Sequence, residues 1–186
     1  MNSLFEAGLE LQNFLRQKSW LFCFIGGLAV IRWGELRMTQ DIDLCLLTGF
    51  GNEQLYIEGL LANFRSRVAD PLNFALKNRV LLLFASNDAS VDISLSGLPF
   101  EKQMIVRATP FLFLQGCSLI TCSAEDLIVL KAFADRPQDW MDIEGIIIRQ
   151  GNCLNRCHIF EHLTPLCELK EAPEIVNKLK HLMQEI

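Results

Sequence analysis

The stretch FIGGLAVIRWGELRMTQDIDLCLL, residues 24–47, decides the fold predicted for this chain. It holds a glycine pair, Gly26-Gly27, after a short apolar run, and then Asp41-Ile42-Asp43 inside a second apolar run. Side chains alternate between the two faces of a strand, so Asp41 and Asp43 share one face, about 7 Å apart. Two carboxylates placed in this way repel each other, and their repulsion favours the binding of a cation.

Apolar runs and turn residues around this stretch predict a mixed α/β sheet up to about Cys122 and a helical bundle after it. The expected strands are residues 21–25, 42–47, 79–86 and 91–96, with short edge strands at 111–114 and 118–121. Helices are expected near the N-terminus and at residues 28–33, 53–68, 100–107, 124–134 and 137–148, with Asp70-Pro71 ending the third. Two further helices follow Gly151, hinged at Thr164-Pro165 or at Ala172-Pro173. The expected domains are residues 1–122 and 123–186.

A third carboxylate is predicted on a neighbouring strand. In residues 91–96 the apolar side chains alternate with polar ones, which places Asp92 on a polar face. Nucleotidyl transfer needs Mg²⁺ to bridge phosphate oxygens, and Asp41 and Asp43 supply the oxygen ligands that hard cations prefer. Asp92 can complete a second metal site or take the proton of an attacking hydroxyl. The glycine pair lets backbone N–H groups approach a triphosphate closely.

Each of these features also has a simpler interpretation. A glycine pair after a strand is commonly just a tight turn, and an Asp-x-Asp can lie on the solvent face of an edge strand. Asp92 by itself indicates nothing. The combination of a glycine turn, carboxylates on two strands and matching faces in one short region favours a phosphate and metal site.

The chain resembles the polymerase-β-like nucleotidyltransferase superfamily, and within it the AbiEii-type abortive-infection toxin nucleotidyltransferases. The matching segments are Gly26-Gly27-Leu28-Ala29-Val30, Arg37 to Leu44, Val91-Asp92-Ile93, and Ser123 to Asp142 with Lys131, Arg136 and Asp139. The resemblance covers about residues 24–148, and its motifs are specific together though weak singly.

The resemblance implies a mostly antiparallel nucleotidyltransferase sheet flanked by helices, followed by the C-terminal bundle. It implies a transferase that moves a nucleoside monophosphate from an NTP to a hydroxyl of RNA, for instance tRNA, or of a protein. Mg²⁺ or Mn²⁺ would be held by Asp41, Asp43 and Asp92. The protein would then be the toxin of a toxin–antitoxin pair, with an antitoxin protein as a partner. The implied nucleotide-binding residues are Gly26, Gly27, Arg37, Thr39, Lys131 and Asp139.

Lys131 has two interpretations of equal standing. On a helix behind the sheet its ammonium could reach a β- or γ-phosphate, and we therefore count it among the catalytic candidates. Asp139 and Asp142 are three residues apart on one helix face, where they could position Lys131. Alternatively, the group Lys131, Asp135, Arg136 and Asp139 forms surface ion pairs, and Asp142 is structural. Arg37 and Thr39 could likewise be a surface arginine and a turn hydroxyl.

Composition sets further limits on function. The formal net charge of −5 does not indicate general binding to nucleic acid, which relies on Lys and Arg. An RNA acceptor would therefore need a local basic groove. The first 20 residues lack the features of a signal peptide, and the longest apolar run, residues 21–31, is too short to span a membrane. We therefore expect a soluble, cytoplasmic protein with no membrane partner.

The seven cysteines are an odd number without a CxxC pair, which favours reduced, mostly buried thiols. Cys153, Cys157, His158 and His162 have the i,i+4 spacing of metal ligands, but the two pairs point about 100° apart on one helix. Buried thiols and partly exposed histidines are favoured over zinc, and metal binding at residues 153–167 stays open.

Two other functions remain alternatives. A nucleotidyltransferase-like domain without turnover could bind a nucleotide or a protein partner. A small-molecule transferase, such as one that nucleotidylates an antibiotic, would use the same chemistry on a different acceptor. No G-x-S-x-G, P-loop or G-x-G-x-x-G motif is present.

Overall fold

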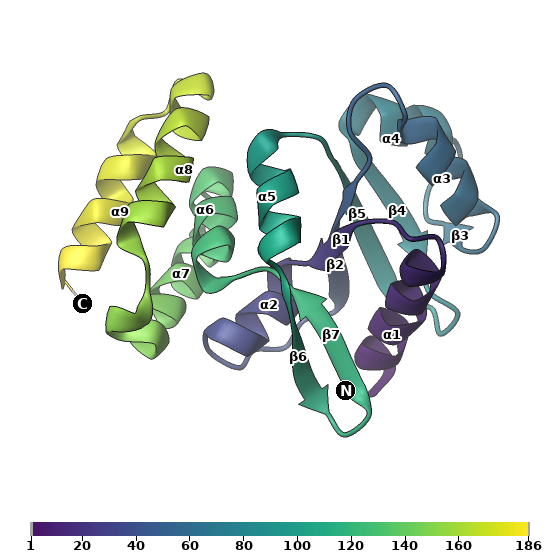
Figure 1. Cartoon of the computed structure of the whole chain (residues 1–186), viewed down its shortest axis with the longest axis horizontal. Helices are drawn as coiled ribbons and strands as arrows, with labels where there is room; N and C mark the ends of the chain where they lie inside the picture. The colour runs from purple at the N-terminus through teal and green to yellow at the C-terminus, as the bar shows by residue number, and fades with distance from the viewer. Residues whose placement is uncertain (1, 186) are drawn as a thin grey trace. The chain divides into compact units, whose positions relative to one another are not determined.

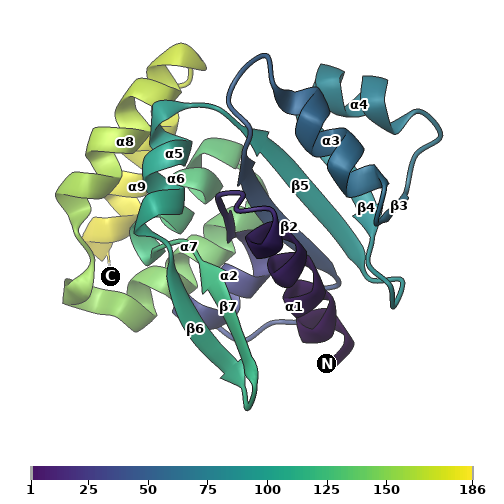
Figure 2. The same ribbon diagram turned by 45° about the vertical axis from the view of Figure 1, so that its right-hand side comes forward.

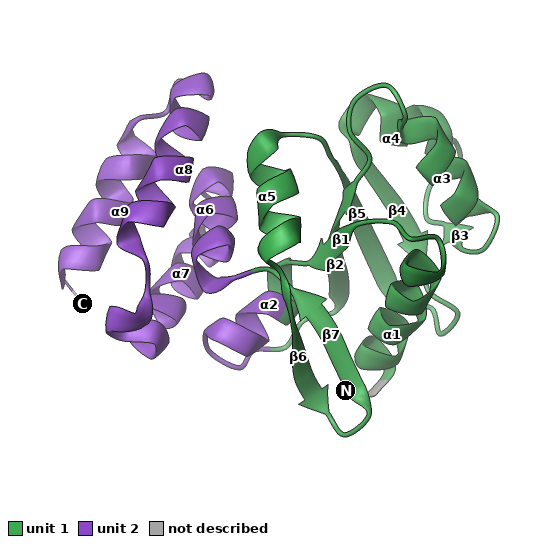
Figure 3. Cartoon of the chain, viewed as in Figure 1, with its two compact units in different colours: residues 1–28, 38–122 green, residues 29–37, 123–186 purple. Residues whose placement is uncertain are grey.

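The computed structural model describes residues 2–185, which include a seven-stranded sheet and a set of helices (Figure 1). The chain divides into two compact units (Figure 3). Unit 1 comprises residues 1–28 and 38–122, and unit 2 comprises residues 29–37 and 123–186. In the described part of the chain, no helix combines the length and the apolar character that crossing a membrane requires.

The sheet belongs to unit 1 and has the strand order β3-β4-β5-β2-β1-β7-β6. Two neighbouring pairs, β2 with β5 and β1 with β7, are parallel, and the other pairs are antiparallel. The prediction of a mixed, mostly antiparallel sheet flanked by helices is therefore confirmed. The strands are β1 (Phe22–Phe24), β2 (Asp41–Leu47), β3 (Arg65–Ser66), β4 (Val80–Phe84), β5 (Ser90–Ser96), β6 (Thr109–Leu114) and β7 (Cys117–Thr121).

One face of the sheet is covered by α1 (Asn2–Gln17), α3 (Glu53–Leu61) and α4 (Pro71–Asn78), as Figure 2 allows the reader to follow. The apolar side chains of β2, β4 and β5 alternate with polar or half-buried ones, and the apolar set packs with these helices in one core. Ile42, Leu44, Leu81 and Ile93 are completely buried there. Alternation therefore turns the polar positions of β2 and β5 to the other face.

The helix predicted for residues 53–68 is shorter in the structure. It ends at Leu61, because Phe64 is buried in the core and Arg65–Ser66 pair with β4 as a short edge strand. Asp70 and Pro71 begin a helix, α4, instead of ending one: Asp70 is the N-cap, and proline suits the first turn, where a missing N–H costs nothing.

Two smaller predictions about unit 1 are also corrected. Residues 118–121 were expected at a sheet edge, but β7 lies between β1 and β6, and β6 is the edge strand on that side of the sheet. The helix expected from Leu28 begins at Gly26, so both glycines belong to the first turn of α2 (Gly26–Trp33). Unit 1 also contains α5 (Pro99–Arg107), which contacts β2.

Unit 2 is helical, as predicted for the last third. Its α6 (Ala124–Ala134) contacts α7 (Pro137–Gln150), α8 (Arg156–Leu169) and α9 (Glu174–Glu185). Ser123 caps α6 by accepting a hydrogen bond from the Asp126 N–H at 3.1 Å. The break between the last two helices lies at Ala172-Pro173, whereas Pro165 lies inside α8.

Candidate active site

The three predicted carboxylates lie on two adjacent parallel strands of unit 1. Strands β2 and β5 pair in a register that places Asp43 directly opposite Asp92 and Asp41 opposite Ser90. Their apolar neighbours Ile42 and Val91 are buried in the core on the opposite face. The structure thus brings Asp41, Asp43 and Asp92 to one face of the sheet, the face turned away from α1, α3 and α4.

The glycine pair lies directly against this group. A β-carbon on Gly26 would lie 2.0 Å from Asp43 Oδ2, and the φ angle of Gly26 is +54°. A β-carbon on Gly27 would lie 2.3 Å from Thr39 Oγ1, and this hydroxyl in turn donates to the Asp41 carbonyl at 3.2 Å. Only glycine allows both the left-handed backbone and these close approaches. Gly26 therefore packs against the Asp43 carboxylate and Gly27 against Thr39, which is bonded to the backbone of Asp41.

An arginine that the sequence reasoning missed binds the third carboxylate, Asp92. Arg67 donates a hydrogen bond from Nη1 to Asp92 Oδ1 and forms an ion pair with it. Residues 65–67 were predicted as part of a helix, which concealed the pairing. Arg65, Ser66 and Arg67 are three consecutive polar residues without the apolar and polar alternation that marks a strand, so the sequence carries no local signal for this pairing.

The donor set suits a divalent cation. Carboxylate oxygens are the preferred ligands of Mg²⁺, and the lack of a side chain at Gly26 allows the Asp43 carboxylate to lie where a β-carbon would otherwise overlap it. As the side chains stand, no three His, Cys, Asp or Glu residues between 2 and 185 converge on one metal position. Asp92 is engaged with Arg67, so coordination by all three carboxylates stays a prediction that requires side-chain rotation.

The remaining predicted residues form an ion-pair cluster within unit 2. Lys131 Nζ donates to Asp139 Oδ1 at 3.1 Å and to Asp142 Oδ2 at 2.6 Å, and all three side chains are at most 7% exposed. Arg37 Nε donates to Asp142 Oδ1 at 2.8 Å, and Arg136 Nε donates to Asp139 Oδ2 at 2.7 Å. Each buried carboxylate therefore has two cationic partners.

These partners change the acidity of the two carboxylates. Burial acts to raise the pKa of Asp139, but hydrogen bonds from Arg136 and Lys131 outweigh it and hold the pKa below its ordinary value of 3.8. Burial acts on Asp142 in the same way, and hydrogen bonds from Lys131 and Arg37 lower its pKa. Phosphate binding by Arg37, Lys131 or Asp139 stays a prediction, and it would require this cluster to open.

A thiol on the carboxylate strand adds no nucleophile. Cys45 follows Asp43 by two residues and is only 2% exposed. Burial raises the pKa of Cys45 to about 12, although a hydrogen bond with Ser96 acts in the opposite direction. The thiol therefore stays protonated at neutral pH.

The Cys/His segment of unit 2 does not form a metal cluster among the described residues. Cys153 and Cys157 are exposed, while the rings of His158 and His162 meet edge to face at a centroid distance of 4.4 Å. His158 Nε2 lies 3.1 Å from Asp126 Oδ1.

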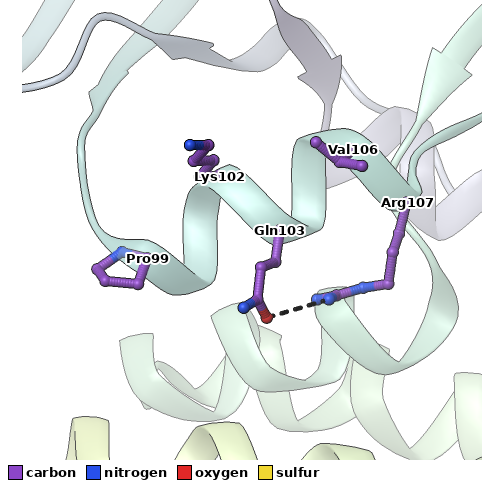
Figure 4. A pocket seen from close by; sticks show the side chains of 5 residues that line it. All are labelled: Pro99, Lys102, Gln103, Val106 and Arg107. Atoms are coloured by element: carbon purple, nitrogen blue, oxygen red, sulfur yellow. Dashed lines mark hydrogen bonds between the residues drawn. The ribbon is translucent and has the colours of Figure 1, made fainter.

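Two hollows in unit 1 are lined by other residues than the predicted ones. One, of about 340 Å³, follows α5 and is lined by Pro99, Lys102, Gln103, Val106 and Arg107, with Arg107 donating to Gln103 (Figure 4). The other, of about 670 Å³, is lined in part by Trp20, Leu47 and Tyr56. Leu47 ends β2, whereas Asp41 begins it, so this second hollow lies at the opposite end of the strand from the carboxylates.

Comparisons with known proteins bear on the fold. A scan against models of protein families found no match, and a search of curated proteins found no relative. Among solved structures, the lincosamide antibiotic adenylyltransferase LnuA, with lincomycin bound, is similar with a TM-score of 0.52 and 13% identity. That likeness covers 76% of this chain and 94% of LnuA.

Two further structures are similar over almost the whole chain. An antigenic nucleotidyltransferase-like protein from Paracoccidioides brasiliensis gives a TM-score of 0.51 and 16% identity, covering 94% of this chain and 90% of that one. The antibiotic-resistance factor ANT(2'')-Ia gives a TM-score of 0.52 and 16% identity, covering 98% and 97%. The chain therefore has the fold of nucleotidyltransferases, as the sequence predicted.

Proposed function

We propose that this protein is a metal-dependent nucleotidyltransferase that moves a nucleoside monophosphate from an NTP to a hydroxyl group and releases pyrophosphate. The observation that supports the proposal most directly is the in-register pair of Asp43 and Asp92, with Gly26 packed against the Asp43 carboxylate. A glycine that served only to form a tight turn would not need to have its α-carbon packed against a carboxylate on the polar face of the sheet.

Asp41, Asp43 and Asp92 would hold Mg²⁺ or Mn²⁺, and the bound cation would neutralise charge on the reacting phosphate oxygens. The N–H groups of Gly26 and Gly27, in the first turn of α2, would bind the triphosphate. Thr39 packs on Gly27 and would hold the segment that leads into Asp41. Asp92 would accept the proton of the attacking hydroxyl or complete a second metal position.

For the acceptor we propose a hydroxyl of RNA or of a protein, with the chain acting as the toxin of a toxin–antitoxin pair. The support is the resemblance of residues 24–148 to AbiEii-type enzymes. A small-molecule acceptor is the second candidate, because LnuA is an antibiotic adenylyltransferase with lincomycin bound and ANT(2'')-Ia is an antibiotic-resistance factor.

The proposal is tested by incubating the protein with Mg²⁺ and each labelled NTP in the presence of total RNA, cell protein or hydroxylated antibiotics. Pyrophosphate release and transfer of label to one acceptor class are expected. Asp43→Asn should lower turnover by about a hundredfold or more, because a metal ligand is lost. Asp88→Asn is the matched control, since Asp88 is an exposed carboxylate that pairs with Arg65.

Label on RNA or protein would support the toxin-type acceptor, and label on an antibiotic would support the second candidate. Binding of an NTP without turnover on any acceptor would contradict the enzymatic proposal and support a nucleotide-binding domain. Equal loss of turnover in Asp43→Asn and Asp88→Asn would contradict the assignment of the site.

A further inference from the structure

Arg67 stands in line with two of the proposed metal ligands. The register of β3 with β4 places Arg65 opposite Phe84 and Ser66 opposite Leu83. The N–H of the next residue, Arg67, donates to the Leu82 carbonyl at 3.0 Å. Leu82 is the partner of Asp92, and Asp92 is the partner of Asp43. Arg67, the residue after β3, therefore lies in one row with Leu82 of β4, Asp92 of β5 and Asp43 of β2.

The row is short enough for an arginine to cross. Neighbouring strands lie about 4.8 Å apart, so the Arg67 side chain has to pass only Leu82 to reach Asp92. Leu82 is half-buried and offers no competing charge. The guanidinium forms its ion pair with Asp92 where the two side chains are 27% and 36% exposed. The Phe84 ring also lies near it, with the guanidinium carbon 6.0 Å from the ring centroid.

Arg65 provides an internal comparison. It lies in β3, two residues before Arg67, and its guanidinium carbon is closer to Phe84, at 4.2 Å from the ring centroid. Its partner, however, is Asp88 in the turn before β5, and that pair is 64% and 79% exposed. Arg65 and Arg67 thus both lie near Phe84 and both pair with an aspartate, but Arg65 is more exposed and does not hold a carboxylate of the proposed site.

We propose that Arg67 competes with the divalent cation for Asp92 and thereby sets the affinity of the nucleotide-free protein for metal. This inference rests on the proposed function, because it takes Asp92 as a metal ligand. The guanidinium of Arg67 is a cation. While it is paired with Asp92, the Asp92 carboxylate cannot offer its full negative charge to a metal ion. Arg67 is accordingly a positioning residue, which acts through Asp92.

The test is Mn²⁺ binding to the nucleotide-free protein, measured by electron paramagnetic resonance for the wild type, Arg67→Gln and Arg65→Gln. The substitution Arg67→Gln removes a positive charge within hydrogen-bond distance of Asp92, a proposed metal ligand. It should therefore tighten Mn²⁺ binding by about tenfold. Arg65→Gln should bind Mn²⁺ as the wild type does. Thermal melting of each variant checks that the fold is kept.

A second pair of variants shows whether the effect passes through Asp92. Compared with Asp92→Asn, the double variant Asp92→Asn/Arg67→Gln should show no gain in Mn²⁺ affinity. A gain that persists in the double variant would overturn the inference, and so would equal affinities of Arg67→Gln and Arg65→Gln or a lack of Mn²⁺ binding by Arg67→Gln. None of these measurements uses turnover, so a failure of the transfer reaction would be seen separately.

Discussion

At the scale of single residues, Gly26 is the position where the backbone and the proposed chemistry meet. Its positive φ angle and the 2.0 Å approach that a β-carbon would make to Asp43 are two separate requirements for glycine. The positive φ angle is a requirement of the local backbone alone, whereas the close approach to Asp43 arises because β1 and β2 are paired. Sequence reasoning anticipated the glycine turn, and the structure adds the carboxylate against which it packs.

The substitution Gly26→Ala should destabilise the protein and displace Asp43. A non-glycine residue in the left-handed region costs about 1–2 kcal/mol, and the overlap with the carboxylate adds to this. Gly49→Ala is the control, because Gly49 also has a positive φ, +73°, but has nothing within 4 Å of the added β-carbon. Urea unfolding of both variants checks the prediction, and equal losses in the free energy of unfolding would contradict it.

At the scale of helices, α6 and α7 of unit 2 are joined by buried charges. Lys131 comes from α6, and Asp139 and Asp142 come from α7, one helix turn apart. The segment 29–37 joins the same unit, since Arg37 binds Asp142 and Arg149 and Gln150 donate to the carbonyls of Gly34 and Trp33. The spacing of the two aspartates was visible in the sequence, but their near-complete burial was not.

Lys131→Met should destabilise the protein by about 3 kcal/mol, because it leaves two buried carboxylates without their shared partner. Lys178→Met is the matched control: Lys178 is 55% exposed and pairs with Asp135 at 3.4 Å, so its loss should cost about 1 kcal/mol or less. The free energies of unfolding in urea give the comparison. A loss for Lys131→Met no larger than that for Lys178→Met would show that the buried pairs contribute little.

Acid should destabilise the protein through the same carboxylates. Because the pKa values of Asp139 and Asp142 are lowered in the folded state, the unfolded chain takes up protons first as the pH falls. Their contribution is complete above about pH 4, the unfolded value, and is lost as the pH drops through the folded pKa. Urea unfolding between pH 7 and pH 3 should show this decline, and a shallower one in Asp142→Asn. Parallel curves would contradict the assignment.

At the scale of the whole molecule, the cysteines show which side chains the fold shields from solvent. In the described part of the chain none of the seven forms a disulfide bond, and five of them are buried: Cys23, Cys45, Cys117, Cys122 and Cys167. Burial raises the pKa of Cys117 and Cys167 as well as that of Cys45. The expectation that most of the thiols are buried agrees with this arrangement.

A thiol reagent such as Ellman's reagent should therefore titrate two thiols rapidly in the native protein, Cys153 and Cys157, and all seven after denaturation. Replacing both exposed residues by serine should remove the rapid phase and leave the slow one. Rapid reaction of more than two thiols in the native protein would show that one of the buried cysteines is accessible.

The sequence by itself determined the alternation of β2 and β5, the sharing of one face by Asp41 and Asp43, and most helix positions, because these follow from local periodicity. Only the tertiary structure decided which strand lies beside which, and hence that Asp92 faces Asp43 and that Arg67 reaches Asp92. It also ended the third helix at Leu61, where burial of Phe64 outweighs local helix preference. Strand pairing and burial join residues far apart in the chain, and no local pattern records them.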